Sequence, residues 1–122
     1  MKILFSILPL LLFATFANAQ SSFKDLDVAG FKQIMNTEKN VVVLDVRTPQ
    51  ETAQGVIKGA VEINLYDPEF EQKIQQLDKS KTYLVYCRSG KRSVSACNVM
   101  AKNGFSKLYN LKGGYNSWSS NR

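Results

Sequence analysis

The stretch Cys87-Arg88-Ser89-Gly90-Lys91-Arg92-Ser93 decides how the rest of the chain is interpreted. It follows an apolar run, Thr-Tyr-Leu-Val-Tyr at 82–86, and it precedes small residues with helical spacing. This order predicts a turn that leads from a buried strand into the N-terminus of a helix. The thiol of Cys87 would then lie at the positive end of a helix dipole, among three cationic side chains and the backbone N–H groups of a Gly-containing turn. These features favour a thiolate and the binding of an anion to it.

The loop resembles the active-site loop of rhodanese-like sulfurtransferases, because four residues separate Cys87 from Arg92 in the order C-R-S-G-K-R. Three further stretches resemble signatures of that family, in the family's order: Asp45-Val46-Arg47, Glu51 with 55–60 (GVIKGA), and 111–118 (LKGGYNSW). Together they span nearly the whole chain after its first 19 residues. One position departs from the pattern, since the family often has His where this chain has Val56. The sequence contains no His, which excludes an imidazole acid or base.

The resemblance implies that Cys87 attacks a sulfane sulfur, holds it as a persulfide and passes it to cyanide or a thiol. Positive potential and N–H donors would lower the pKa of this thiol and bind an anionic donor such as thiosulfate. The residues expected to do so are Arg88, Ser89, Gly90, Lys91, Arg92 and Ser93. No metal or cofactor is expected, and a thiolate that is already formed needs no general base.

Asp45 and Arg47 close an apolar strand, and the resemblance implies a mainly structural role for them. A buried charge needs a partner, so we expect an ion pair that ties this strand end to the site.

Two other functions remain open for the loop. Phosphatases and arsenate reductases have a related cradle that resembles C-x5-R, usually preceded by His. Here the spacing is C-x4-R after Tyr86, so the pocket should be too small for a tetrahedral phosphoryl group. A non-catalytic binding module that senses redox state through a reactive thiol is the second alternative. A purely structural role for Cys87 is less favoured, because structural cysteines usually lie in apolar surroundings.

Strand patterns alternate with helical patterns along the chain, which predicts a three-layer α/β rhodanese-like domain. The sheet should be five-stranded and mostly parallel, flanked by helices, and the resemblance implies the strand order 1-5-4-2-3. The expected strands are 23–26, 41–44, 60–65, 82–86 and 107–109. Five helices are expected. The first starts at Asp27 and ends by Asn40, the second spans 50–54, and the third begins with Asp67-Pro68. The fourth follows the Cys87 loop, and the last carries Trp118. Ligands of such sheets bind at the carboxyl ends of strands, where the Cys87 loop falls.

The second cysteine, Cys97, is expected to be a core residue rather than a disulfide partner. It follows Arg92 by five residues on the predicted helix, about 7 Å further along the helix axis than the loop. That separation exceeds the range that a disulfide tolerates. Ser93, Val94, Met100 and Ala101 should share the inner face of this helix with it.

The first 19 residues predict a secretory signal, followed by one domain over 20–122. Lys2 precedes an apolar segment at 3–16, and Ala17-Asn18-Ala19 is a small-x-small cleavage site. An uncleaved anchor is the alternative, but the apolar run is shorter than the ~20 residues of a spanning helix. We therefore expect a periplasmic or secreted monomer without stable membrane association after cleavage.

The full chain has a net charge of +6, which falls to +5 when Lys2 is removed with the signal. This charge would attract a small anionic substrate, although it could equally serve solubility. Nucleic acid is not an expected partner, because the basic residues are scattered and no aromatic-rich nucleic-acid motif accompanies them.

Overall fold

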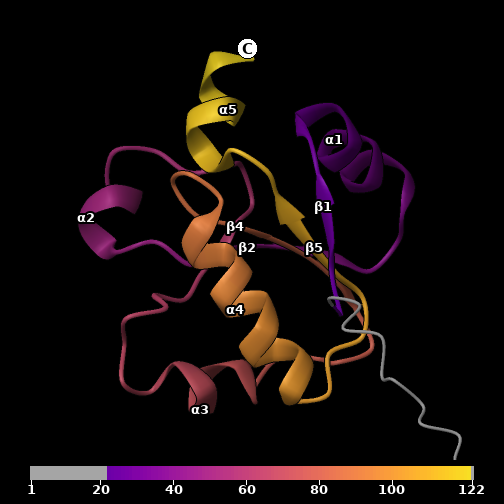
Figure 1. Ribbon diagram of the computed structural model, residues 1–122, viewed down its shortest axis with the longest axis vertical. Coiled ribbons are helices and arrows are strands. Elements are labelled where there is room, and N and C mark those ends of the chain that lie inside the picture. Colours follow the sequence, from indigo (N-terminus) through magenta and orange to yellow (C-terminus); the bar gives the residue numbers. More distant parts are fainter. Residues whose placement is uncertain (1–21, 122) are drawn as a thin grey trace, which may run out of the picture.

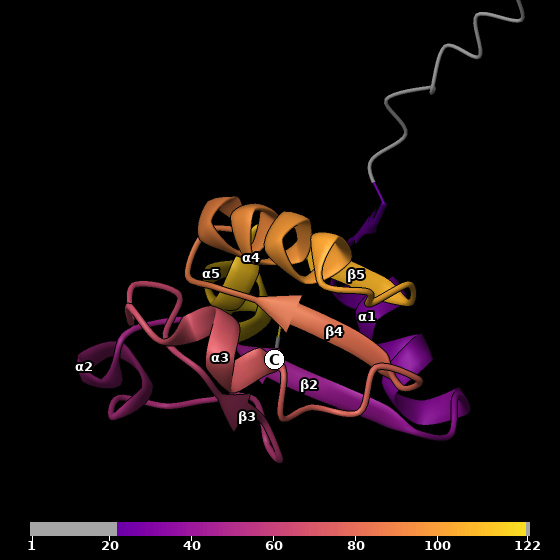
Figure 2. The same cartoon turned by 90° about the horizontal axis from the view of Figure 1, so that it is seen from below.

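Five parallel strands form the central sheet, in the order β1-β5-β4-β2-β3 (Figure 1 labels all but β3, which is labelled in Figure 2). The computed structural model describes residues 22–121, so the predicted signal at 1–19 lies outside the described residues. The strands are β1 (Lys24–Leu26), β2 (Val41–Asp45), β3 (Val61–Glu62), β4 (Thr82–Tyr86) and β5 (Leu108–Leu111). The α/β class and the strand order agree with the prediction, and the sheet is parallel throughout rather than mostly parallel.

Residues 22–121 also form five helices, four of which pack on the two faces of the sheet. They are α1 (Val28–Thr37), α2 (Pro49–Thr52), α3 (Phe70–Ile74), α4 (Lys91–Lys102) and α5 (Gly114–Ser120). One buried cluster joins α3 and α4 to the sheet, and a second joins α1 and α5 to it. Figure 2 shows α4 lying along one side of the strands. None of the helices within residues 22–121 combines the length and apolarity needed to cross a membrane.

The strand before the loop, β4, is the centre of the core. All five of its residues are buried, and it pairs with β2 on one side and with β5 on the other. A strand covered on both faces is continuously apolar rather than alternating, which explains why this run was recognisable in the sequence. The carboxyl end of β4 therefore holds the loop at the middle of a rigid sheet.

The helix α4 is held to the sheet by small and flexible side chains on its inner face. Ser93, Cys97 and Met100 are buried as predicted, but Ala96 takes a fully buried position, whereas Val94 and Ala101 are only half-buried. The helix ends as predicted at Asn103-Gly104. The N–H groups of Gly104 and Phe105 bond to carbonyls of the last turn, which is the Schellman pattern.

Two predicted elements differ from the structure. The strand expected at 60–65 is reduced to Val61–Glu62, because regular pairing with β2 stops where β2 ends at Asp45, although the N–H of Leu65 still donates to the Val46 carbonyl. The helix expected to begin at Asp67-Pro68 begins at Phe70 instead. The Asp67 carboxylate accepts the N–H of Glu69, two residues on, and so forms a turn rather than an N-cap.

Candidate active site

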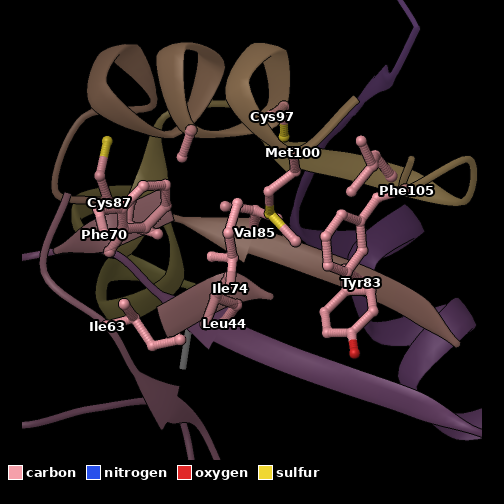
Figure 3. Packing of buried hydrophobic residues seen from close by; sticks show 13 residues of the cluster. Leu44, Ile63, Phe70, Ile74, Tyr83, Val85, Cys87, Cys97, Met100 and Phe105 are labelled. Carbon is pink, nitrogen blue, oxygen red and sulfur yellow. The ribbon is translucent and has the colours of Figure 1, made fainter. Parts of the chain in front are cut away.

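The Cys87 loop lies between the carboxyl end of β4 and the first residue of α4, as predicted. The sulfur of Cys87 is surrounded by hydrogen-bond donors. The N–H of Gly90 donates to Sγ at 3.1 Å, and the hydroxyl of Ser93 donates to it at 3.3 Å. The residue itself has an exposed fraction of 0 %. Figure 3 shows Cys87 and Phe105 at opposite ends of the cluster on this side of the sheet.

Burial alone would raise the pKa of Cys87, because it penalises the charged form. Hydrogen bonds from the hydroxyl and N–H of Ser93, and from the N–H groups of Gly90 and Ser89, outweigh that effect and lower the pKa below its ordinary value. The sulfur is therefore favoured as a thiolate by directed donors.

Gly90 adopts a conformation that suits glycine. Its φ of 95° lies in the left-handed region, and a Cβ at this position would stand 3.0 Å from the backbone N of Gly113 and 3.1 Å from the carbonyl oxygen of Leu111. Any other residue would have a strained backbone here, and its Cβ would also be crowded by these two atoms. The loop thus needs glycine where one N–H must reach the sulfur.

The N-terminal end of α5 holds the loop from outside. The N–H groups of Tyr115 and Asn116 donate to the carbonyls of Cys87 and Arg88 at 2.8 and 3.0 Å. In a trans peptide the carbonyl and the following N–H point in opposite directions, so these bonds turn the N–H of Ser89 away from α5. Gly114 permits this contact, because a Cβ there would lie 2.5 Å from the Cys87 carbonyl oxygen.

The three cations of the loop have different environments. Arg88 and Lys91 are exposed, and neither forms an ion pair with any residue of 22–121. Arg92 is half-buried and binds both carboxylate oxygens of Glu51, at 2.7 and 2.8 Å. Its guanidinium carbon also lies 5.6 Å from the ring centre of Tyr66. Arg92, which the sequence analysis expected to bind the sulfur donor, is therefore paired with the Glu51 carboxylate in this structure.

Glu51 takes part in the site, although the sequence analysis predicted no role for it there. Its side chain closes the capping box of α2 with Thr48, which places the carboxylate beside Arg92. The bond from Arg92 is the largest cause that lowers the pKa of Glu51 to about 2. The T-x-x-E pattern at 48–51 could have located this helix start, but not the partner 41 residues away.

Asp45 and Arg47 form the buried ion pair that was expected, with Nη2 to Oδ2 at 2.7 Å. Arg47 also donates to the Gly55 carbonyl at 2.7 Å, and its guanidinium lies 4.3 Å from the ring centre of Tyr115. The pair thus ties the end of β2 to the segment before β3 and to α5.

A cavity of about 330 Å³ lies beside the loop. Its lining combines cationic, anionic and amide side chains from three parts of the chain: Arg47, Gln50, Glu51, Gln54, Arg88, Tyr115, Asn116 and Ser119. Arg47 and Glu51 already have ion-pair partners, so Arg88 is the cation that remains available to an anion there.

Cys97 has a different environment from Cys87. Both cysteines are free thiols, and Figure 3 shows Cys97 projecting from α4 toward the sheet. Burial raises the pKa of Cys97 to about 12, whereas that of Cys87 is lowered. The expectation that Cys97 is a core residue is confirmed.

The buried Cys87 thiol, the donors around it and the all-parallel sheet are features shared with a known family. The sequence pattern of the Rhodanese-like domain family matches residues 27–121. The chain belongs to the rhodanese-like family. Its similarity to solved rhodanese-like folds agrees with this: the rhodanese-like domain protein from Staphylococcus aureus superposes with a TM-score of 0.69 at 28 % identity, covering 78 % of this chain and 90 % of that one.

Curated relatives of this rhodanese-like protein include sulfurtransferases. The chain is 36 % identical over 95 residues to the putative sulfurtransferase YtwF of Bacillus subtilis, covering 78 % of this chain and 89 % of the relative. It is 34 % identical over 98 residues to the thiosulfate sulfurtransferase GlpE of Shewanella oneidensis, covering 80 % and 94 %. The protein is thus a single rhodanese-like domain related to sulfurtransferases.

Proposed function

We propose that this rhodanese-like protein transfers a sulfane sulfur from thiosulfate, or a similar anionic donor, to cyanide or a thiol through a persulfide on Cys87. The observation that supports it most is the Cys87 sulfur with its two hydrogen-bond donors, Gly90 N–H and Ser93 Oγ, at the carboxyl end of the central strand. The resemblance to a thiosulfate sulfurtransferase supports the choice of donor.

In the first half-reaction the Cys87 thiolate attacks the outer sulfur of thiosulfate. A new S–S bond forms to Cys87, the bond between the two donor sulfurs breaks, and its electron pair leaves with sulfite. The thiolate and the thiosulfate dianion become a persulfide anion and a sulfite dianion, so charge is conserved and no proton moves. A chain without His can perform this step because the nucleophile is deprotonated beforehand.

In the second half-reaction an acceptor removes the outer sulfur. Cyanide attacks the terminal sulfur of the persulfide, the S–S bond breaks, and its electron pair returns to Cys87. Thiocyanate leaves and the thiolate is restored. A thiolate acceptor would react in the same way and carry the sulfur off as its own persulfide.

The loop residues have distinct roles in this proposal. The N–H groups of Ser89 and Gly90 and the hydroxyl of Ser93 stabilise negative charge on the sulfur, while Arg88 and Lys91 attract the anionic donor. Arg92 stabilises the departing sulfite once the donor competes with Glu51 for its guanidinium. Arg92→Ala should lower the transfer rate by about 10²-fold, the usual effect of removing one charge-assisted donor from a reacting anion.

We also infer that the chain is exported, on the support of the signal pattern at 1–19. N-terminal sequencing of the protein recovered from a periplasmic or culture fraction should begin at Gln20. Recovery of uncleaved protein from the membrane fraction would favour the anchor instead.

The central test is a thiosulfate:cyanide assay combined with intact-protein mass spectrometry. Thiosulfate should add the mass of one sulfur atom to the wild type, and cyanide should remove it as thiocyanate. Cys87→Ser should lose both signals, whereas the matched Cys97→Ser control should keep them. If Cys87→Ser still transfers sulfur, or if donors add no sulfur to the wild type, the proposed sulfur transfer through Cys87 is wrong. The alternative, a redox-sensing binding module, is then favoured.

A further inference from the structure

Asn110 is a buried polar side chain on β5 that the chemistry described so far does not use. It has an exposed fraction of 2 %, and it stands in register with Asp25 of β1 and Val85 of β4. It lies two residues beyond Leu108, so both side chains point to the face that α4 covers. Asn110 is therefore under the loop, one strand away from Cys87.

The amide nitrogen of Asn110 makes two hydrogen bonds in different directions. It donates to Oδ1 of Asp25 at 2.9 Å and to the carbonyl oxygen of Gly90 at 3.3 Å. The Asn110 Oδ1 atom is buried and accepts from no group of residues 22–121. Leaving a buried acceptor unpaired costs free energy, so an apolar side chain would serve packing better at this position. The donating amide is the feature that distinguishes Asn110 from such a residue.

The bond to Gly90 reaches the part of the loop that has the greatest conformational freedom. A glycine can occupy left- and right-handed backbone conformations with similar ease. Gly90 is held at both of its polar groups: its N–H donates to Cys87 Sγ, and its carbonyl accepts from Asn110. These two bonds fix Gly90 in one backbone conformation, with φ 95° and ψ −2°.

We propose that Asn110 is a positioning residue, which holds the Gly90 carbonyl and thereby keeps the Gly90 N–H directed at the sulfur of Cys87. The consequence for catalysis rests on the proposed sulfur transfer, but the orientation of Gly90 does not. Without the bond, Gly90 loses one of the two contacts that fix its φ and ψ, so its N–H is less firmly directed at the sulfur and stabilises the negative charge there less well.

A structural role is the alternative explanation, because Asn110 also ties β5 to β1 through Asp25. The two roles use different partners, and they can therefore be separated. Asp25→Ala removes the bond between the strands and leaves the bond to Gly90. Asn110→Leu removes both bonds while keeping a side chain of similar size.

The experiment is an ultraviolet titration of the Cys87 thiolate in the full chain. Each variant is compared with the same variant carrying Cys87→Ser, and the difference reports Cys87 alone. The titration is read well below the pKa of Cys97, which burial and, to a lesser degree, the charges of Asp25 and Cys87 raise to about 12. Arg92 and Ser93 of α4, which also act on the sulfur, stay unchanged in every variant.

Asn110→Leu should raise the pKa of Cys87, so that the thiolate fraction at a fixed lower pH falls about threefold. Asp25→Ala should not raise it, because this change removes a negative charge and leaves Gly90 in place. Circular dichroism establishes that each variant is folded. If Asn110→Leu does not fold, Asn110→Ser replaces it, since its shorter side chain does not reach Gly90 and leaves the packing less crowded.

An unchanged thiolate titration in a folded Asn110 variant would overturn the proposal. An equal rise in Asp25→Ala would overturn it as well, because the strand tie would then explain the effect. The titration does not require turnover, so its outcome is independent of the sulfur-transfer assay. Failure of that assay in the wild type would reject the proposed function and leave the positioning role intact.

Discussion

The two cysteines are both buried on the same side of the sheet, and they differ in what surrounds the sulfur. Hydrogen bonds lower the pKa of Cys87, whereas burial without such donors raises the pKa of Cys97 to about 12. Because the thiolate is the reactive form, alkylation of the native reduced protein should modify Cys87 much faster than Cys97. Peptide mapping after a short exposure to iodoacetamide measures this. Comparable labelling of the two sites, or a disulfide between them, would contradict it.

The ion pair between Glu51 and Arg92 should be visible in the pH dependence of stability. The pKa of Glu51 is lowered to about 2 from its ordinary 4.5 by Arg92, so the pair stabilises the fold fully above about pH 4.5 and loses this effect as the pH falls through about 2. Glu51→Gln should therefore lower the free energy of unfolding by about 1–2 kcal/mol at pH 7, and by progressively less in acid.

Urea denaturation at several pH values measures this difference. Glu71→Gln is the matched control, since Glu71 is exposed and has no ion-pair partner among residues 22–121. A loss that is the same at pH 7 and in acid would contradict the ion pair. In the transfer assay, Glu51→Gln should also lower the KM for thiosulfate, because it releases Arg92 and removes a repelling charge beside the cavity.

At the scale of elements, the contact of α5 with the loop depends on Gly114. Gly114 has a φ of 57°, and a Cβ there would lie 2.5–2.6 Å from backbone atoms of Cys87 and Arg88. Gly114→Ala should therefore cost more than the roughly 1–2 kcal/mol of left-handed strain, because the loop and the helix must also separate. Sulfur transfer should fall with stability.

Gly59→Ala provides the comparison, since Gly59 has a φ of 83° but nothing within 4 Å of the added Cβ. It should show the strain alone and keep its activity. Thermal unfolding and the thiosulfate:cyanide assay distinguish the two variants. Equal losses in both would show that the close contact of α5 with the loop is unimportant.

The sequence predicted most elements because their signals are local. The continuous apolar run of β4 and the Asn103-Gly104 helix end are examples, and both are confirmed. The length of β3 could not be predicted, because it depends on where its neighbour β2 ends. The start of α3 was predicted too early, because Asp67 can cap a helix or form a turn with the same side chain.

The site shows the same limit. The position of Cys87 between strand and helix follows from adjacent residues and was predicted. The partner of Arg92 and the bond from Asn110 to Gly90 join residues 41 and 20 positions apart, and no periodicity encodes such pairs. Sequence reasoning therefore located the Cys87 loop between its strand and its helix, but it missed the residues that hold the loop from other elements.

At the scale of the whole molecule, the net charge of +6, or +5 once Lys2 is removed with the proposed signal, should assist the encounter with an anionic donor. The kcat/KM for thiosulfate should fall severalfold between about 0.01 M and about 1 M ionic strength, over which the Debye length shortens from about 30 to about 3 Å. A monoanionic alkanethiosulfonate should show a weaker salt dependence. If the kcat/KM for thiosulfate does not change with salt, the net charge does not assist the encounter and serves solubility alone.

The pairing of β1 with β5 joins the beginning of the described domain to its end, with Lys24 opposite Tyr109 and Leu26 opposite Leu111. During synthesis on the ribosome the first strand must wait for the last, because the sheet cannot be completed until residue 111 has emerged. The hydrogen bonds to the carbonyls of Cys87 and Arg88 can form only later, because their donors are the amides of Tyr115 and Asn116. The support of the Cys87 loop by α5 is therefore one of the last contacts that a nascent chain can form.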